Sequence, residues 1–179
     1  MNFGAELGID ICRKDFRETL LETEIRACKP SVSGGVMVDG AVRFIGAVEE
    51  AGELAKIRVF PEFCSGLKGV EGFSHLIILY WIHLRDREEE RRTLLVFPRR
   101  HGVNVETGVF ACRSPSRPNP IGLCVVELVK VEDCVLTVRG LDAFEGSPVI
   151  DIKPYIPRID SFPEARVPYW ALHEGAAKR

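Results

Sequence analysis

Residues 123–139 read LCVVELVKVEDCVLTVR, two β-prone runs joined by a tight turn at Glu132-Asp133. In the second run the apolar residues Leu136 and Val138 alternate with polar residues, the period-2 pattern of a strand with one buried face. Two such runs separated by a short polar turn predict an antiparallel hairpin.

The rest of the chain after residue 40 shows the same character. Further β-prone runs lie at 42–48, 56–60, 74–84, 93–97, 107–112 and 149–153. Few segments have a helical period, and no GxGxxG follows a strand and opens a helix, which disfavours a Rossmann site. The sequence therefore predicts a mainly β, non-Rossmann fold, an antiparallel barrel or sandwich.

Composition limits the class of protein. The chain has 179 residues, a net charge of −2 and 46% apolar residues, which fits one soluble globular domain without a broad basic face for nucleic acid. Six scattered cysteines without a CxxC pair predict reduced thiols, and four dispersed histidines predict no metal site. The absence of a membrane-length apolar run or a secretory signal predicts a cytoplasmic protein with no membrane partner.

The first forty residues differ in character from the β-rich remainder of the chain. Asp15 and Glu18 resemble a capping box, and a short helix is expected over Phe16–Cys28, followed by a flexible connector at Ser31–Gly35. Met37 comes next and is a candidate alternative start. We expect an N-terminal extension at 1–40, helical or flexible, a β-barrel domain at 41–165 and a C-terminal tail at 166–179.

A stiff loop enters the hairpin from the N-terminal side. Residues 113–123 read RSPSRPNPIGL, and three prolines fix φ and remove three backbone donors. Arg113, Arg117 and Asn119 are mounted on this proline loop, and guanidinium groups match phosphates or carboxylates. The alternative interpretation is a proline-rich connector with surface arginines.

A second polar segment comes after the hairpin. Residues 141–148 read LDAFEGSP, with carboxylates at Asp142 and Glu145 before a Gly-Ser-Pro turn. This acidic turn has the groups to hold ribose hydroxyls or an amino group. In the alternative, Asp142 caps the turn, Glu145 is solvated, and Asp151 pairs with Lys153 on one strand face.

Taken together, these segments resemble the TsaA-like family, which includes the TrmO-type tRNA methyltransferases. The matching strings are FSHL at 73–76, GVFACRS at 108–114, RPNPIG at 117–122, LD at 141–142, GSPV at 146–149 and DIKPY at 151–155. The resemblance covers residues 42–163. It implies an antiparallel β-barrel, usually dimeric, that binds S-adenosylmethionine and methylates N6 of threonylcarbamoyladenosine beside the tRNA anticodon.

The resemblance also implies site residues. The implied cofactor-binding residues are His83, Leu84, Arg113, Arg117, Glu145, Gly146, Ser147 and Pro148. Arg113, Asn119, Lys153 and Tyr155 are candidates for substrate binding, and Asp142 and Asp151 are candidate proton acceptors. Methyl transfer needs alignment and no metal, so a pre-formed loop suits it.

The chain departs from the family pattern at three places. Glu145 and Ser147 replace the usual Asp and Thr, Cys112 replaces Thr, and Glu49-Glu50-Ala51-Gly52 replaces a Pro-Arg-Gln-Pro-Gly-Leu-type loop. The last change leaves two alternatives open: methyl transfer to a different acceptor, or a non-catalytic protein that binds S-adenosylmethionine and acts through partners.

Overall fold

The computed structural model describes residues 25–26, 41–98 and 104–172, and the chain divides into two compact units, Met1–Phe44 and Ile45–Arg179. In the first unit, β1 (Ile25–Arg26) pairs antiparallel with β2 (Ala41–Val42). The helix predicted over Phe16–Cys28 is therefore wrong at residues 25 and 26. The i,i+4 spacing of Glu22 and Arg26, which favours a helix there by only a few tenths of a kcal/mol, is outweighed by the pairing of β1 with β2. The other residues of that predicted helix lie outside the described part of the chain.

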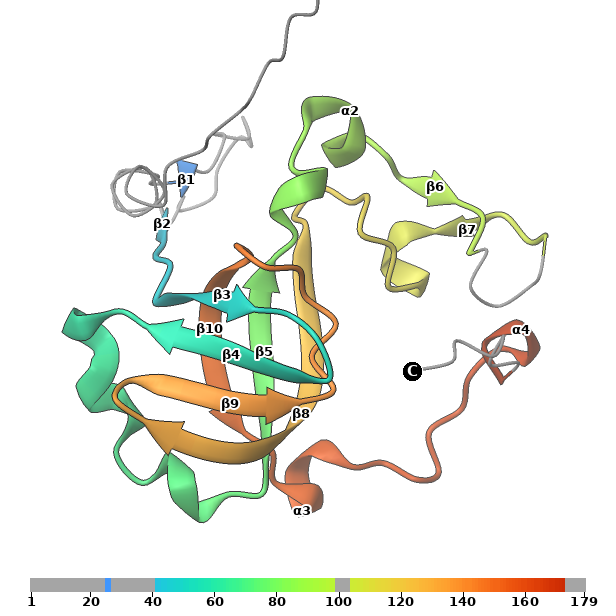
Figure 1. Ribbon diagram of the computed structural model, residues 1–179. Coiled ribbons are helices and arrows are strands. Elements are labelled where there is room, and N and C mark those ends of the chain that lie inside the picture. The colour runs from blue at the N-terminus through green and yellow to red at the C-terminus, as the bar shows by residue number, and fades with distance from the viewer. Residues whose placement is uncertain (1–24, 27–40, 99–103, 173–179) are drawn as a thin grey trace, which may run out of the picture. The chain divides into compact units, whose positions relative to one another are not determined.

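The second unit contains a closed antiparallel barrel with the strand order β10-β3-β4-β9-β8-β5 (Figure 1). Its strands are β3 (Gly46–Glu50), β4 (Leu54–Val59), β5 (His75–Trp81), β8 (Ile121–Glu132), β9 (Val135–Arg139) and β10 (Pro148–Pro154). The mainly β, non-Rossmann prediction is confirmed, and the barrel alternative is the correct one. Closure pairs both edges of every strand, so the ring exposes no open ladder.

Short elements connect and follow the strands. They are η1 (Pro61–Leu67), η2 (Val70–Gly72), η3 (His83–Arg85), α2 (Glu88–Arg91), β6 (Leu95–Val96), β7 (Thr107–Gly108), η5 (Val109–Ala111), α3 (Pro157–Asp160) and α4 (Tyr169–Leu172). β6 and β7 pair as a separate antiparallel hairpin. In the described ranges, no helix is long and apolar enough to span a membrane.

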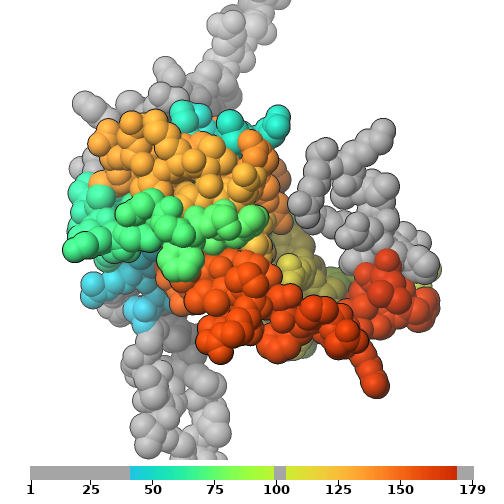
Figure 2. Space-filling view, turned by 90° about the horizontal axis from the view of Figure 1, so that it is seen from below, coloured from blue at the N-terminus to red at the C-terminus, as the bar shows by residue number. Residues whose placement is uncertain are grey.

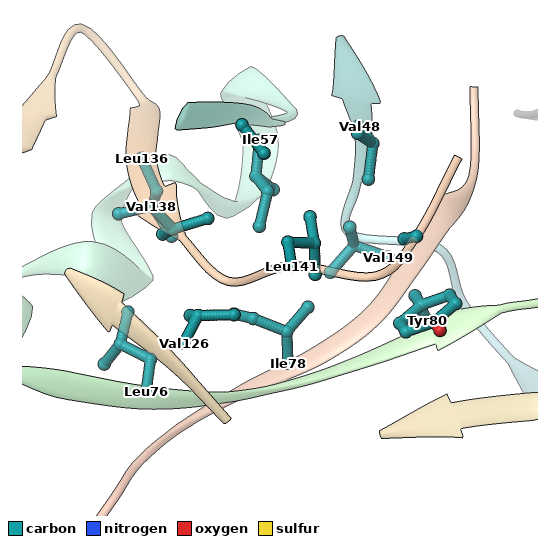
Figure 3. Packing of buried hydrophobic residues seen from close by; sticks show 12 residues of the cluster. Val48, Ile57, Leu76, Ile78, Tyr80, Val126, Leu136, Val138, Leu141 and Val149 are labelled. Atoms are coloured by element: carbon teal, nitrogen blue, oxygen red, sulfur yellow. The ribbon is translucent and has the colours of Figure 1, made fainter. Parts of the chain in front are cut away.

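The barrel interior is filled by side chains from all six strands and from the segment after β9 (Figure 3). The inward residues are aliphatic except for Tyr80, which is 7% exposed. Leu136 and Val138 are completely buried, as the alternation in β9 predicts. The core thus confirms the hairpin from which the fold was inferred.

In β10, the residues that face the barrel interior differ from those that the alternation of the sequence predicts. The sequence places both Ile150 and Ile152 on the inward face, but a register shift between Val149 and Asp151 introduces a bulge at Ile150. Val149 is the fully buried residue, while Ile150 is only half-buried. A bulge inserts one extra residue into the strand, so the alternation restarts after it.

One prediction about the cysteines is wrong. Cys64 in η1 and Cys134 in the β8–β9 turn form a disulfide with a Cα–Cα distance of 5.4 Å. Cys112 and Cys124 form no disulfide within the described ranges, and Cys12 and Cys28 lie outside those ranges. The sequence did not reveal the pair because its members are 70 residues apart and meet only through the folding of the barrel.

Candidate cofactor-binding site

The end of β5 from which the chain continues to α2 is the meeting point of the two polar segments. On one side, Trp81 pairs with Ile121, and the Ile82 N–H donates to the Pro120 carbonyl at 2.7 Å, which fixes the exit of the proline loop. On the other side, His83 Nδ1 lies 3.3 Å from the Ser147 hydroxyl. The proline loop and the acidic turn therefore both contact residues 81–83, at and directly after the end of β5.

The acidic turn is held in a single conformation. Gly146 has a φ of +79°, a value that favours glycine, and its N–H donates to Val48 at 2.8 Å. The Ser147 N–H donates to Phe144 at 3.0 Å, and Ser147 is only 2% exposed. Glu145 stays exposed and has no partner among the described residues, so its carboxylate is available to a ligand.

Tyr80 brings Asp142 into this site. The Tyr80 hydroxyl donates to Asp142 Oδ1 at 2.8 Å, so a core side chain orients a surface carboxylate. The ring of Tyr80 lies over Gly122, its direct partner on β8, and a Cβ at Gly122 would be 2.2 Å from the ring. This contact explains why a glycine follows the proline loop.

Arg117 braces the proline loop from within. Its Nη2 donates to the carbonyls of Val109 and Cys112, the latter at 2.6 Å. Its Nε–H is buried without a partner among the described residues. One nitrogen of the guanidinium thus stabilises the loop, and the buried Nε–H is left for a ligand. Arg113 and Asn119, by contrast, are exposed side chains without partners in the described ranges.

A charged cluster that the sequence did not predict attaches the loop to the barrel. Arg91 in α2 pairs with Asp86, donates to the Pro118 carbonyl at 3.3 Å and lies 5.3 Å above the Trp81 ring. Trp81 Nε1 in turn donates to Asp86 at 2.9 Å. The hydrogen bond from Arg91 lowers the pKa of Asp86 below its usual value.

The mixed-charge run at residues 85–92 predicts a solvated loop or short helix. α2 confirms the short helix, but Arg91 also has this structural role. Asp86 and Arg91 are five residues apart, so the usual i,i+3 and i,i+4 helical spacings do not indicate the pair. The pairing partner on the loop is a backbone carbonyl, which carries no sequence signal.

The remaining predicted residues do not all join this site. Leu84 is exposed beside His83. Lys153 pairs with Ile77, about 13 Å along β5 from Trp81, and the Tyr155 N–H donates to His75 at the opposite end of the strand, about 20 Å from Trp81.

Asp151 is also engaged away from the acidic turn. It forms an ion pair with Lys153 at 2.6 Å and accepts the Ile152 N–H at 2.9 Å. The alternative of a same-face ion pair is therefore confirmed for these two side chains. Of the two carboxylates considered as proton acceptors, only Asp142 is held at the site by Tyr80.

His83 gives the site a testable pH dependence. Burial lowers its pKa below the ordinary value near 6.5, so the folded protein favours the neutral imidazole. Its contribution to stability is complete above pH 6.5 and is lost as the pH falls from there through the lowered pKa. We expect urea unfolding of the His83→Gln variant between pH 7.5 and 5 to show a smaller loss of stability than the wild type. An identical pH dependence in both proteins would contradict this account.

Comparisons with known proteins agree with this geometry. The family model of the tRNA-methyltransferase O N-terminal domain matches residues 46–161, which contain the barrel and both polar segments. The chain belongs to this family. The resemblance inferred from the sequence is thereby confirmed.

Two curated relatives illustrate the range of the family. The chain is 52% identical over 109 residues to a "Probable S-adenosyl-L-methionine-binding protein" of Methanothermobacter thermautotrophicus, covering 61% of this chain and 74% of that protein. It is 43% identical over 129 residues to the Escherichia coli "tRNA (adenine(37)-N6)-methyltransferase", covering 69% of this chain and 54% of that protein. The chain thus spans about half the length of the second relative.

Solved structures show the same fold. The crystal structure of TrmO from Pseudomonas aeruginosa superposes with a TM-score of 0.58 at 28% identity, covering 76% of this chain and 63% of that one. A second TrmO crystal structure gives a TM-score of 0.56 at 30% identity, covering 71% of this chain and 62% of that one. Both solved chains extend beyond the part that this chain matches.

Proposed function

We propose that this protein is an S-adenosylmethionine-dependent methyltransferase that modifies N6 of threonylcarbamoyladenosine beside the anticodon of tRNA. Family membership and the names of the curated relatives support the reaction class. The observation that carries the proposal is the joint contact of the proline loop and the acidic turn with one end of β5. A structural connector does not require two polar segments at one strand end.

The residues at this site suit the proposed cofactor. When bound, S-adenosylmethionine supplies a methyl group on a positively charged sulfonium. Glu145, exposed and unpaired within the described ranges, attracts that charge, and the Nε–H of Arg117 offers a buried donor to a carboxylate or hydroxyl. The turn at Gly146 and Ser147 is already rigid, so no conformational entropy of the turn would be lost when it holds the cofactor.

Proton removal from the acceptor is the other task of the site. A urea-like N6 has a delocalised lone pair, so methylation benefits from a nearby base. Asp142 is oriented by Tyr80 at 2.8 Å, and His83 is biased toward its neutral, proton-accepting form by burial. We propose Asp142 as the acceptor, with His83 as the alternative.

The second candidate function is methyl transfer to an acceptor other than threonylcarbamoyladenosine. The observation that favours this function is the hairpin between β3 and β4. Glu49 pairs with Arg58, and Glu50 pairs with Lys56 at 2.9 Å, at the place where the family resemblance implies a proline-containing loop. Val48, which precedes them, accepts the Gly146 N–H of the acidic turn. The altered hairpin therefore adjoins the site and bears on which substrate enters.

The decisive experiment has two steps. Isothermal calorimetry first measures S-adenosylmethionine binding to the full chain. Labelled methyl transfer is then measured with tRNA that does or does not carry threonylcarbamoyladenosine. Label only in the modified tRNA supports the proposal, label in another acceptor supports the second function, and binding without any transfer supports a non-catalytic protein. Absence of binding would overturn all three.

The expected partners derive from this function. We propose that tRNA is the macromolecular substrate, that the protein works in the cytoplasm where tRNA is decoded, and that it forms a homodimer, as the family resemblance implies. Analytical ultracentrifugation with and without S-adenosylmethionine tests the dimer. A monomer in both conditions would contradict it.

Phe144 is a candidate platform for the target base. It is 63% exposed on the acidic turn, and its carbonyl is fixed by the Ser147 N–H at 3.0 Å. Unstacked RNA bases stack on such aromatic rings, with about 1–3 kcal/mol per base. We expect Phe144→Ala to raise KM for tRNA roughly tenfold, while Phe144→Trp retains activity and cofactor affinity is unchanged.

The matched control is Phe162→Ala, which removes a phenylalanine that is 73% exposed in the segment after α3. Its KM should equal that of the wild type. Loss of cofactor affinity in Phe144→Ala, or equal KM values in both variants, would contradict the stacking role.

A further inference from the structure

The disulfide between Cys64 and Cys134 joins η1 to the turn between β8 and β9. Asp133 and Cys134 form this turn with φ values of +48° and +64°, one residue later than the sequence predicted. Both values are typical of a two-residue hairpin turn, a place where asparagine and glycine are favoured. A cysteine there is conformationally unusual, and its carbonyl is also held by the Val59 N–H at 2.9 Å. The turn is therefore a fixed anchor for whatever it is bonded to.

The segment bonded to this anchor, Pro61–Gly72, has few other attachments. Neither η1 nor η2 contains a buried residue. Its loop and cap hydrogen bonds are local, for example Lys68 to Ser65 at 3.3 Å and Gly72 to Gly69 at 3.2 Å. Only Leu67 and Val70 pack partly against the barrel core. Segments with so little burial and mainly local hydrogen bonds open at low free energy.

The same segment forms one wall of a cavity of about 370 Å³. Phe63, Leu67 and Val70 line the cavity from this wall, and Ile45, Val59 and Ile152 face them from the barrel. Figure 2 views the molecule from below, where the segment reaches the molecular surface. Cys64 and Cys134 are both half-buried, so the disulfide lies outside the fully buried core.

We propose that Cys64–Cys134 is a thiol-responsive latch that holds Pro61–Gly72 against the barrel, where the segment forms one wall of this open pocket. A low-molecular-weight thiol attacks one sulfur as its thiolate and forms a mixed disulfide. A second thiol then attacks the small-molecule sulfur of this mixed disulfide, and the protein sulfur leaves as a thiolate and takes up a proton, which gives two protein thiols and one small-molecule disulfide. The protein gains two electrons and two protons, and the segment is released. The site at the end of β5 is unaffected.

Limited trypsin digestion of the full chain tests the latch. Lys68 is the single trypsin site between Arg58 and Arg85, and it is exposed in the middle of the segment. Cleavage after Lys68 should be roughly tenfold faster in dithiothreitol than in the oxidised protein. Cleavage after Arg166, an exposed site on the C-terminal tail, serves as the internal reference and should not change.

Two variants complete the design. Cys64→Ser should show fast cleavage after Lys68 with and without dithiothreitol, and Cys124→Ser should behave as the wild type. Circular dichroism establishes whether each variant is folded. If Cys64→Ser is unfolded, the test rests on the cleavage rates of the oxidised and the reduced wild-type protein alone.

Three results would overturn the proposal. One is an equal cleavage rate after Lys68 in both redox states. Another is an equal acceleration of cleavage at all trypsin sites, which would show that the disulfide stabilises the whole fold and not this segment in particular. The third is alkylation of both cysteines in the oxidised protein.

Discussion

Arg117→Ala is expected to weaken S-adenosylmethionine binding at least tenfold and to lower the free energy of unfolding by roughly 2 kcal/mol. The substitution removes two hydrogen bonds from a charged donor to the Val109 and Cys112 carbonyls, so the loop loses its internal brace. It also removes the one buried side-chain donor that has no protein partner in the described part of the chain. Calorimetry measures the affinity, and urea unfolding measures the stability.

Arg113→Ala is the matched comparison, because this arginine is on the same loop but exposed and unpaired in the described ranges. Its stability should equal that of the wild type, and any effect should appear in methyl transfer alone. Arg117→Ala with full affinity would show that the loop does not contact the cofactor. Arg117→Ala with full stability would show that the two carbonyl contacts contribute little.

Gly122→Ala is expected to destabilise the protein by about 3 kcal/mol, the upper part of the usual range for overpacking a core. The new Cβ would lie 2.2 Å from the Tyr80 ring, and that ring is buried in the barrel beside Val149 (Figure 3). The ring must move, and its hydroxyl then loses Asp142. We therefore expect methyl transfer to fall as well. Thermal unfolding and the tRNA assay measure the two effects.

The control is Gly72→Ala, where a Cβ would meet no atom within 4 Å. Both stability and activity should stay at the wild-type level. Tyr80→Phe separates the two causes, because it removes the hydroxyl and keeps the packing. If Gly122→Ala is as stable as Gly72→Ala, the tight contact between ring and glycine is not present in solution.

Local patterns predicted the barrel well because its strands obey local rules. The alternation around Leu136 and Val138 and the apolar run of β5 are direct consequences of a pleated strand with one buried face. The bulge at Ile150 did not show in the pattern, since it depends on how β10 fits between β3 and β5. The residue types in β10 alone therefore do not predict where the bulge lies.

The site was also predictable only in part, namely where local sequence composition marks it. The proline loop and the acidic turn stand out by composition, and their meeting at β5 is a property of the strand order. The contacts of Arg117 and Arg91 are to backbone carbonyls, which every residue has, so their partners could not be named in advance. Cys64 and Cys134 likewise met without any spacing signal.

The closed ring of strands has a consequence for how this protein could change over time. Every strand edge of the ring is already paired, so the hydrogen-bonded cylinder does not depend on an exposed connector such as the one between β3 and β4. The exposed hairpin at Glu49–Gly52 can therefore be exchanged or lengthened while the cylinder persists, whereas Leu141 and Ala143 in the connector after β9 fill the core and have to be kept. Grafting connectors between members of the family is a practical route to new acceptors on this scaffold.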